Sequence, residues 1–264
     1  MSHKVIISIT LLLAAIFTAP NVIAATSLIN DADQAYMNDN FERALELYTE
    51  ASEQDGVSSN LYYNIGNCYY RLGNMGKAIV NYERALKLDP SNSDAAANLS
   101  FVNSRIVDKP VDNASLTEKI GERILGKFTS DTWAWITFGL FALFIAATAG
   151  YIFLSAVIMR KTCFFSGLVL IVLTIGGIVL TLTSARRTIS TENAIIITES
   201  VNLGTSPRIP KDKSEEAFLL HEGTRLQIVD SLTTNNGTTP TKWYEVKVDR
   251  DHRAWINSDN VEKI

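Results

Sequence analysis

Aromatic, amide and arginine side chains recur between residues 36 and 105, and these residue types are suited to binding another molecule. Aromatic rings and guanidinium groups often anchor a protein partner, and amides add hydrogen bonds to an extended peptide. The candidate partner-binding residues are Tyr36, Asn60, Tyr63, Asn67, Tyr70, Arg71, Phe101 and Arg105. Each is also an ordinary surface residue of a helix, so the set is more informative than its members.

A second candidate site lies near the C-terminus, where Trp243, Tyr244 and Trp255 provide aromatic surface for a peptide or a cell-wall fragment. The alternative is that the two tryptophans complete a small core with few other large side chains. His221 and His252 are assigned structural or incidental roles, because neither has a second His, Cys or carboxylate at the spacing of a metal site. The sequence leaves both interpretations of the aromatic residues open.

Catalytic motifs are missing from the 264 residues. There is no nucleophile elbow, glycine-rich phosphate loop, pair of metal ligands or nucleotide motif. We therefore expect no catalytic residues, no metal and no cofactor. The formal net charge of −4 comes without a strong basic run in either flank, so nucleic-acid binding is not expected. Cys68 falls among apolar helix positions and is expected to be a small buried residue.

The first group of candidate residues lies on a sequence with a period of 34 residues. The segment Phe41–Ala51 aligns with Met75–Ala85, which places Tyr48 opposite Tyr82. This period, with small and aromatic residues at fixed places, resembles the tetratricopeptide repeat, a pair of packed helices. In the second copy the matching positions are Tyr62, Ile65, Gly66, Tyr69, Ala78, Tyr82, Ala85 and Pro90. We expect an α-solenoid of about 2.5 repeats over residues 26–108.

The resemblance implies that the first helices of the repeats form a groove for a protein partner. Some relatives clamp a C-terminal carboxylate there, but only Asn67 fits that pattern, because Asp33 and Phe101 stand at the corresponding places. No such clamp is predicted. Solenoids usually need about three repeats for stability. Support is therefore expected from self-association, from a helix near the membrane or from the C-terminal region.

Two apolar runs, Trp133–Met159 and Cys163–Ala185, follow the repeats without a single Asp, Glu, Lys or Arg. At about 1.5 Å of rise per residue, each can cross the roughly 30 Å hydrocarbon layer. We predict transmembrane helices at 132–159 and 163–185 that form a hairpin, with Arg160, Lys161 and Thr162 as the turn. A hairpin places the residues before and after it on one face of the membrane.

The orientation follows from the N-terminus, where residues 1–25 resemble a secretory signal peptide. The alternative is an uncleaved signal anchor, and either form exports the repeats. The basic turn would then be cytoplasmic, although Arg186 and Arg187 lie on the exported side. The connector at 109–131 contains a capping box, Ser115 to Glu118, and a short amphipathic helix. That helix either lies in the lipid interface or packs under the repeats.

Beyond the apolar runs, residues 193–264 contain short β-branched and aromatic segments separated by turn formers, which predicts a small all-β domain. The expected strands are Ala194–Thr198, Thr224–Val229, Trp243–Val248 and Arg253–Ile256. The segments Leu220–Thr224 and Ala254–Ile256 give the domain a resemblance to a bacterial SH3-like barrel. Ala254 departs from that family, which usually has glycine before the Trp-Ile pair.

The whole order resembles the BatE family of the bacterial aerotolerance operon. This resemblance implies a two-pass inner-membrane protein of Gram-negative-type bacteria, with the repeats and the barrel in the periplasm. It also implies partners among von Willebrand A-domain Bat proteins and a MoxR-type ATPase. We expect a non-enzymatic scaffold that contacts protein partners and membrane lipid. The alternative is a sensor of peptidoglycan or of a secreted ligand, although a three-residue cytoplasmic turn offers little surface for signalling.

Overall fold

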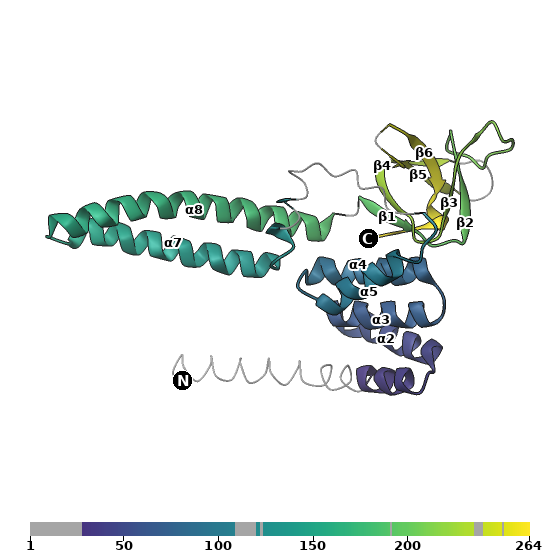
Figure 1. Ribbon diagram of the computed structural model, residues 1–264, viewed down its shortest axis with the longest axis horizontal. Coiled ribbons are helices and arrows are strands. Elements are labelled where there is room, and N and C mark those ends of the chain that lie inside the picture. The colour runs from purple at the N-terminus through teal and green to yellow at the C-terminus, as the bar shows by residue number, and fades with distance from the viewer. Residues whose placement is uncertain (1–27, 109–119, 122–123, 191, 235–239, 250) are drawn as a thin grey trace, which may run out of the picture. The chain divides into compact units, whose positions relative to one another are not determined.

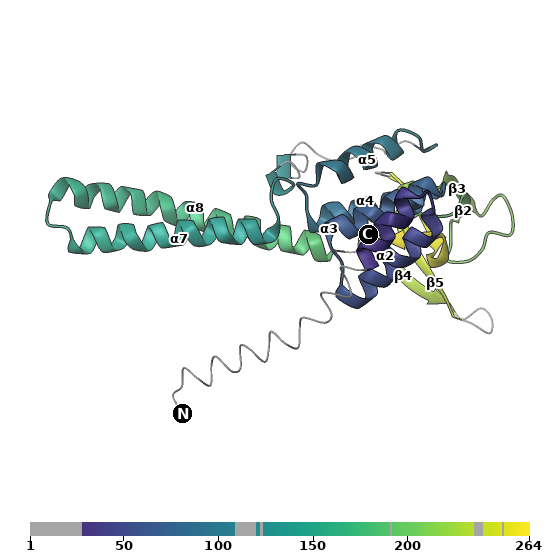
Figure 2. The same cartoon turned by 90° about the horizontal axis from the view of Figure 1, so that it is seen from below.

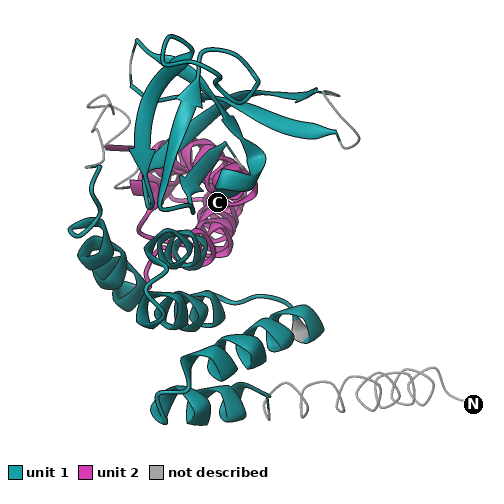
Figure 3. Cartoon of the chain, turned by 90° about the vertical axis from the view of Figure 1, so that its right-hand side faces the viewer, with its two compact units in different colours: residues 1–86, 93–111, 192–264 teal, residues 87–92, 112–191 magenta. Residues whose placement is uncertain are grey.

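The computed structural model describes residues 28–108, 120–121, 124–190, 192–234, 240–249 and 251–264 (Figure 1). The predicted signal peptide and most of the predicted connector lie outside these residues. The chain forms two compact units (Figure 3). Unit 1 combines residues 1–86, 93–111 and 192–264, and unit 2 combines residues 87–92 and 112–191. The segments that precede and follow the apolar helices therefore belong to the same unit.

The N-terminal part of unit 1 is a series of helices joined by short turns (Figure 2). A helix at 28–37 is followed by α2 (Phe41–Asp55), α3 (Ser59–Arg71), α4 (Met75–Leu88) and α5 (Ser93–Asn103). Side chains cap two of them: Asn40 accepts from the Arg43 N–H, and Ser58 accepts from the Leu61 N–H. Alanines at the helix contacts are buried, so the helices approach closely. A helical repeat region is present, as the 34-residue period predicts.

The period is repeated in the hydrogen bonding. The Tyr48 hydroxyl donates to Asp33 Oδ1, and 34 residues later the Tyr82 hydroxyl donates to Asn67 Oδ1 at 2.8 Å. Each bond joins the second helix of a repeat to its first helix. A Cβ at Gly66 would lie 2.7 Å from the Tyr82 ring, so glycine at this position lets the tyrosine cross the first helix. Both repeats are thus fixed internally in the same way.

The C-terminal part of unit 1 is one antiparallel sheet in the order β3-β2-β6-β5-β4-β1-β7. Its strands are β1 (Asn193–Ile196), β2 (Ser200–Gly204), β3 (Glu216–His221), β4 (Arg225–Thr234), β5 (Thr241–Lys247), β6 (Arg253–Asn257) and β7 (Val261–Lys263). A 3₁₀ turn at Ser258–Asn260 precedes β7. The expectation of an all-β domain is confirmed, and the four expected strands correspond to β1, β4, β5 and β6.

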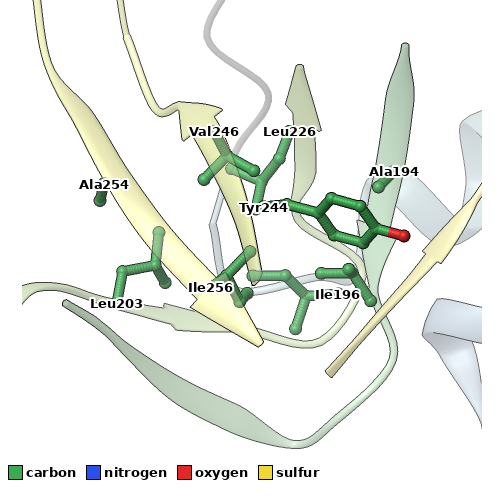
Figure 4. Close-up of a cluster of buried hydrophobic side chains, with 9 residues drawn as sticks. Ala194, Ile196, Leu203, Leu226, Tyr244, Val246, Ala254 and Ile256 are labelled. Carbon is green, nitrogen blue, oxygen red and sulfur yellow. The ribbon is translucent and has the colours of Figure 1, made fainter. Parts of the chain in front are cut away.

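The sheet curls around a core but does not close. Ile196, Leu203, Tyr244 and Ile256 are among the buried side chains on its inner face (Figure 4). The strands β3 and β7 are the two edges of the described sheet and are not hydrogen-bonded to each other. The sheet is antiparallel and all-β, as predicted, but the predicted SH3-like barrel is not closed.

Both sheet edges bind side chains from the helical part of unit 1. At β7, Arg84 of α4 donates to Glu262 Oε1 and to the Lys263 carbonyl, both at 2.7 Å. At β3, Asp108 Oδ2 accepts from the His221 N–H at 2.6 Å. Backbone groups at a sheet edge need partners, and pairing with another strand is only one way to supply them. Here Arg84 and Asp108 bind one backbone group at each edge.

Between these edges, helices and sheet share a buried cluster. Side chains of α4, including Ile79 and Tyr82, pack with Ile195 of β1. The buried members of the cluster are Ala78, Ile79, Val80, Tyr82, Val102, Ile106, Ile195 and Ile264. Polar contacts surround the cluster. The Gly76 N–H donates to Glu222 Oε1 at 2.8 Å, and Arg225 donates to Glu83 Oε1 at 3.0 Å. The repeats thus receive their support from the C-terminal sheet.

Asp108 is the most highly bonded carboxylate of this contact. Besides the His221 N–H, it accepts from the Thr224 hydroxyl at 2.8 Å, and the His221 ring Nδ1 lies 3.2 Å from its Oδ1. Burial raises the pKa of the Asp108 carboxyl, but the hydrogen bonds from His221 and Thr224 outweigh it, so the pKa is lowered below its ordinary value. The charged form of Asp108 therefore stabilises the contact.

Unit 2 is dominated by two helices, α7 (Ser130–Phe153) and α8 (Val157–Ile189), which are long and apolar enough to cross a membrane. Each has the length and composition of a membrane span, as the apolar runs predict. The break between them lies at residues 154–156, whereas the sequence predicted a turn at Arg160–Thr162. Arg160 instead lies in the first turn of α8 and donates from Nε to the Tyr151 carbonyl at 3.2 Å. It thereby satisfies a carbonyl in the last turn of α7.

Gly223 offers a direct test of the contact between helices and sheet. It has φ +87°, and a Cβ there would lie 2.6 Å from Ile106 Cγ2 and 3.0 Å from Ile79 Cδ1. Gly73 has a similar φ of +83° but nothing within 4 Å of a Cβ, so it is the matched control. We expect Gly73→Ala to cost about 1 kcal/mol of backbone strain and Gly223→Ala about 3 kcal/mol. The melting temperature of Gly223→Ala should be about 5 °C below that of Gly73→Ala, and equal values would contradict the contact.

The depressed pKa of Asp108 predicts a pH-dependent contribution to stability. Because the native pKa lies below the ordinary value of about 3.9, the stabilisation is complete above that value and is lost as the pH falls through the native pKa. We expect Asp108→Asn to cost about 2 kcal/mol at neutral pH and nothing in strong acid. Thermal unfolding of both proteins across this pH range measures the difference.

Asp249→Asn is the control for this measurement. Hydrogen bonds from the Asp251 N–H and from His252 lower the pKa of the Asp249 carboxyl, so it shares the electrostatic property of Asp108. Its partners, however, lie within three residues of it in the loop between β5 and β6. The Asp249→Asn substitution should therefore leave the contact between helices and sheet unchanged. A difference between Asp108→Asn and the parent chain that does not vary with pH would refute the role of the charge.

Candidate functional site

Tyr70 of α3, Phe101 of α5 and Arg105, which follows α5, form a cluster. In the repeat pattern α3 and α5 are both first helices of a helix pair. The Tyr70 and Phe101 rings meet edge to face with centroids 5.8 Å apart. The Arg105 guanidinium lies 4.2 Å from the Phe101 centroid, and its Nη1 donates to the Tyr70 hydroxyl at 3.1 Å. Phe101 is 45% exposed. This Tyr70 cluster therefore presents an aromatic ring and an arginine to solvent in a fixed arrangement.

A related cluster lies one repeat earlier. Tyr36 and Phe41 meet edge to face at 5.2 Å, and the Arg71 guanidinium lies 4.1 Å from the Phe41 centroid. Arg71 also forms an ion pair with Asp39 at 2.9 Å. Burial raises the pKa of the Tyr36 hydroxyl, even though the Arg71 guanidinium favours its charged form. Tyr36 therefore stays neutral in this Tyr36 cluster.

The tyrosine and the arginine of the two clusters are equivalent under the repeat, whereas Phe41 and Phe101 are not. Tyr36 and Tyr70 are 34 residues apart, and so are Arg71 and Arg105. Equivalent positions of a solenoid lie on the same face. The clusters differ in charge compensation, because Asp39 neutralises Arg71, whereas Arg105 has no carboxylate partner among the described residues. The Tyr70 cluster is thus the better placed of the two to attract an acidic group.

The remaining predicted residues of this face have different roles. Asn67 Oδ1 accepts from the Tyr82 hydroxyl and from Asn98 Nδ2, both at 2.8 Å, so it holds the repeats together. Tyr63 is half-buried with its ring 6.1 Å from that of Tyr82, and Asn60 is exposed. The prediction missed Phe41 and Asp39. Phe41 belongs to the aligned segments, but its contact with Arg71 crosses between repeats and has no local pattern.

Cys68 is not a reactive group in this arrangement. Its side chain is fully buried in the cluster that contains Ala44, Leu47 and Ile65, and it is not in a disulfide. Burial raises the pKa of the Cys68 thiol to about 12. Only the thiolate is an effective nucleophile. At neutral pH Cys68 therefore acts as a small packing residue.

The predicted residues of the sheet are mostly internal. Trp243 is 5% exposed and Tyr244 is 7% exposed, whereas Trp255 is half-buried. The ammonium groups of Lys263 and Lys242 lie 4.8 Å and 5.4 Å from the Tyr244 centroid and cover that ring. This geometry favours the core interpretation for Trp243 and Tyr244. A ligand role for the three residues stays a prediction.

The two histidines each lie beside one carboxylate. His221 faces Asp108, and His252 Nδ1 lies 2.8 Å from Asp249, a residue that the spacing argument overlooked. One carboxylate does not complete a metal site. Within the described ranges, no group of three or more His, Cys, Asp and Glu side chains is placed to hold a metal ion.

Comparison with known proteins supports the repeat assignment. The sequence profile of the tetratricopeptide repeat family matches residues 59–92, which cover α3, α4 and the turn after them. The chain is similar to a rice protein described as "Protein SGT1 homolog", with 38% identity over 68 residues, 26% of this chain and 18% of that protein. This chain thus spans less than a fifth of the length of that relative. Among solved structures, the Arabidopsis OM64 TPR domain shares 21% identity over 32% of this chain and 69% of its own, with a TM-score of 0.31.

Proposed function

We propose that this protein is a non-enzymatic membrane-anchored scaffold that captures a protein partner on the first-helix face of its repeats. The observation that carries the proposal is the Tyr70 cluster, a solvent-facing ring and an uncompensated arginine on a tetratricopeptide repeat. Aromatic and arginine side chains are the residues that most often dominate binding energies at protein interfaces. The partner would place an acidic group against Arg105 and an apolar side chain against Phe101.

The anchor in this proposal is the pair α7 and α8. Unit 1 combines residues that precede α7 and residues that follow α8 in the sequence. The chain must therefore cross the membrane an even number of times between these two segments. The repeats and the sheet then share one compartment. We assign that compartment to the periplasm, because the predicted signal peptide would export the repeats and because Arg160 and Lys161, just after the break between the helices, favour a cytoplasmic position for it.

At a finer level, we propose that the scaffold belongs to a BatE-like aerotolerance system. Its partners would be von Willebrand A-domain Bat proteins and a MoxR-type ATPase system. This rests on the order of repeats, apolar helix pair and C-terminal β domain, together with the predicted signal peptide. The second candidate function is ligand sensing by the sheet, for which the half-buried Trp255 is the aromatic residue to test.

The test is crosslinking in intact membranes, with crosslinked partners identified by mass spectrometry. The test variant carries Phe101→Ala and Arg105→Ala, which remove exposed groups and leave the repeat core intact. Since a hot-spot residue contributes about 2 kcal/mol or more, partner recovery should fall at least about tenfold. Arg43→Ala is the matched control, because Arg43 is an exposed, ion-paired arginine on the second helix α2.

Two outcomes would overturn parts of the proposal. Unchanged recovery of all partners with the Phe101→Ala and Arg105→Ala variant would remove the binding face from the Tyr70 cluster. Release of the parent chain by carbonate washing of the membranes would remove the anchor. Loss of recovery in both the test variant and Arg43→Ala would point to general charge effects and would likewise count against the site.

A further inference from the structure

A groove of about 500 Å³ lies where α7 turns into α8. It is lined by Tyr151, Val157, Arg160, Lys161, Phe164 and Phe165. Its walls are mostly apolar, and both of its charged residues are basic. The apolar runs on either side of the two basic residues, 133–159 and 163–185, contain no charged residue.

The groove is built by a close helix contact. A Cβ at Gly150 would lie 2.8 Å from Cys163 Sγ, so glycine allows the helices to touch just before the turn. This contact places the Tyr151 ring 5.8 Å from that of Phe164, which in turn lies 5.5 Å from Phe165. The three rings form a continuous aromatic wall.

Arg160 is held above this wall. Its Nε donates to the Tyr151 carbonyl, and its guanidinium lies 5.2 Å from the Tyr151 ring centroid. These contacts fix the side chain while using only one of its nitrogens as a donor. Among the residues that the structure describes, neither Arg160 nor Lys161 has a carboxylate partner, and the sequence from 132 to 191 contains no Asp or Glu at all. The positive charge of the groove is uncompensated.

We propose that this groove binds an anionic phospholipid, with the phosphate at Arg160 and Lys161 and an acyl chain along Phe164 and Phe165. The inference rests on the membrane anchor of the proposed function. Arginine suits phosphate because its planar donors match the phosphate oxygens, and basic pockets beside transmembrane helices bind anionic headgroups. The occupant is a lipid rather than a soluble anion, since most of the lining is apolar.

The spacing of the basic residues supports this position in the membrane. Arg160 and Arg186 are 26 residues apart on one helix, or about 39 Å. A bilayer including its headgroups measures roughly 40–45 Å. Arg160 and Lys161 then lie at one headgroup level and Arg186 and Arg187 at the other. The second pair supplies an equal charge for a matched control.

The experiment is native mass spectrometry of the full chain in detergent with equal amounts of phosphatidylglycerol and phosphatidylcholine of identical acyl chains. We expect the parent chain to retain phosphatidylglycerol at least about tenfold in preference. The double variant Arg160→Gln, Lys161→Gln should lose this preference, and Arg186→Gln, Arg187→Gln should keep it. Lys161→Gln alone leaves the Arg160 contact with α7 intact and should reduce the preference severalfold, which covers the case in which the double variant does not fold.

Three results would overturn the proposal. The first is a parent chain without preference for phosphatidylglycerol. The second is an equal loss in both double variants, which would indicate net charge alone. The third is displacement of the lipid by millimolar glycerol 3-phosphate, which would indicate a soluble-anion site. None of these bears on partner capture by the repeats, and a chain that carbonate releases from membranes would instead refute the anchor.

Discussion

The contact between helix α4 and the C-terminal sheet is the constraint on which the rest of unit 1 depends. Arg84 binds the β7 edge, Asp108 binds the β3 edge, and Ile79 and Ile106 pack between them against β1 and Gly223. A short solenoid cannot bury its last apolar face alone. The sheet covers that face, and Arg84 and Asp108 in turn bind one backbone group at each open edge of the sheet. Each part completes the other.

This contact also limits how the two apolar helices can be connected to unit 1. Residues 112–191 are inserted between two segments that must meet again in one unit. In the proposed two-pass arrangement the two helices meet this requirement, because they would return the chain to the side of the membrane from which it left. The Tyr70 cluster, which is the proposed binding face, lies on α3, on α5 and on the segment that follows α5. That segment continues to Asp108, which binds the sheet. The sheet therefore fixes the part of the repeats that would hold a partner.

Local sequence patterns predicted the helices and strands, but they did not predict the contacts between residues far apart in the sequence. The 34-residue period identified the repeat at 59–92, and charge-free runs identified α7 and α8. Four strands followed from β-branched segments. The pairing of Arg84 with Glu262, across 178 residues, has no sequence signature, so the sequence predicted an SH3-like barrel without the contacts at its open edges. Asn67 was predicted as a binding residue because its type fits, yet Tyr82 and Asn98 occupy its oxygen. The turn was placed at Arg160 because charge usually marks a loop, whereas this arginine caps α7 from within α8.

The most direct test of the account is to cut the chain between the repeats and α7. Residues 112–115 are replaced by a protease site, and the purified full chain is cleaved in detergent and analysed by size-exclusion chromatography. No tag is attached at the C-terminus, because Ile264 is buried in the contact. If α4 and the sheet form one unit, the repeat fragment co-elutes with the remainder, and Gly223→Ala weakens this association. Separate elution of the two fragments from the parent chain would contradict the account.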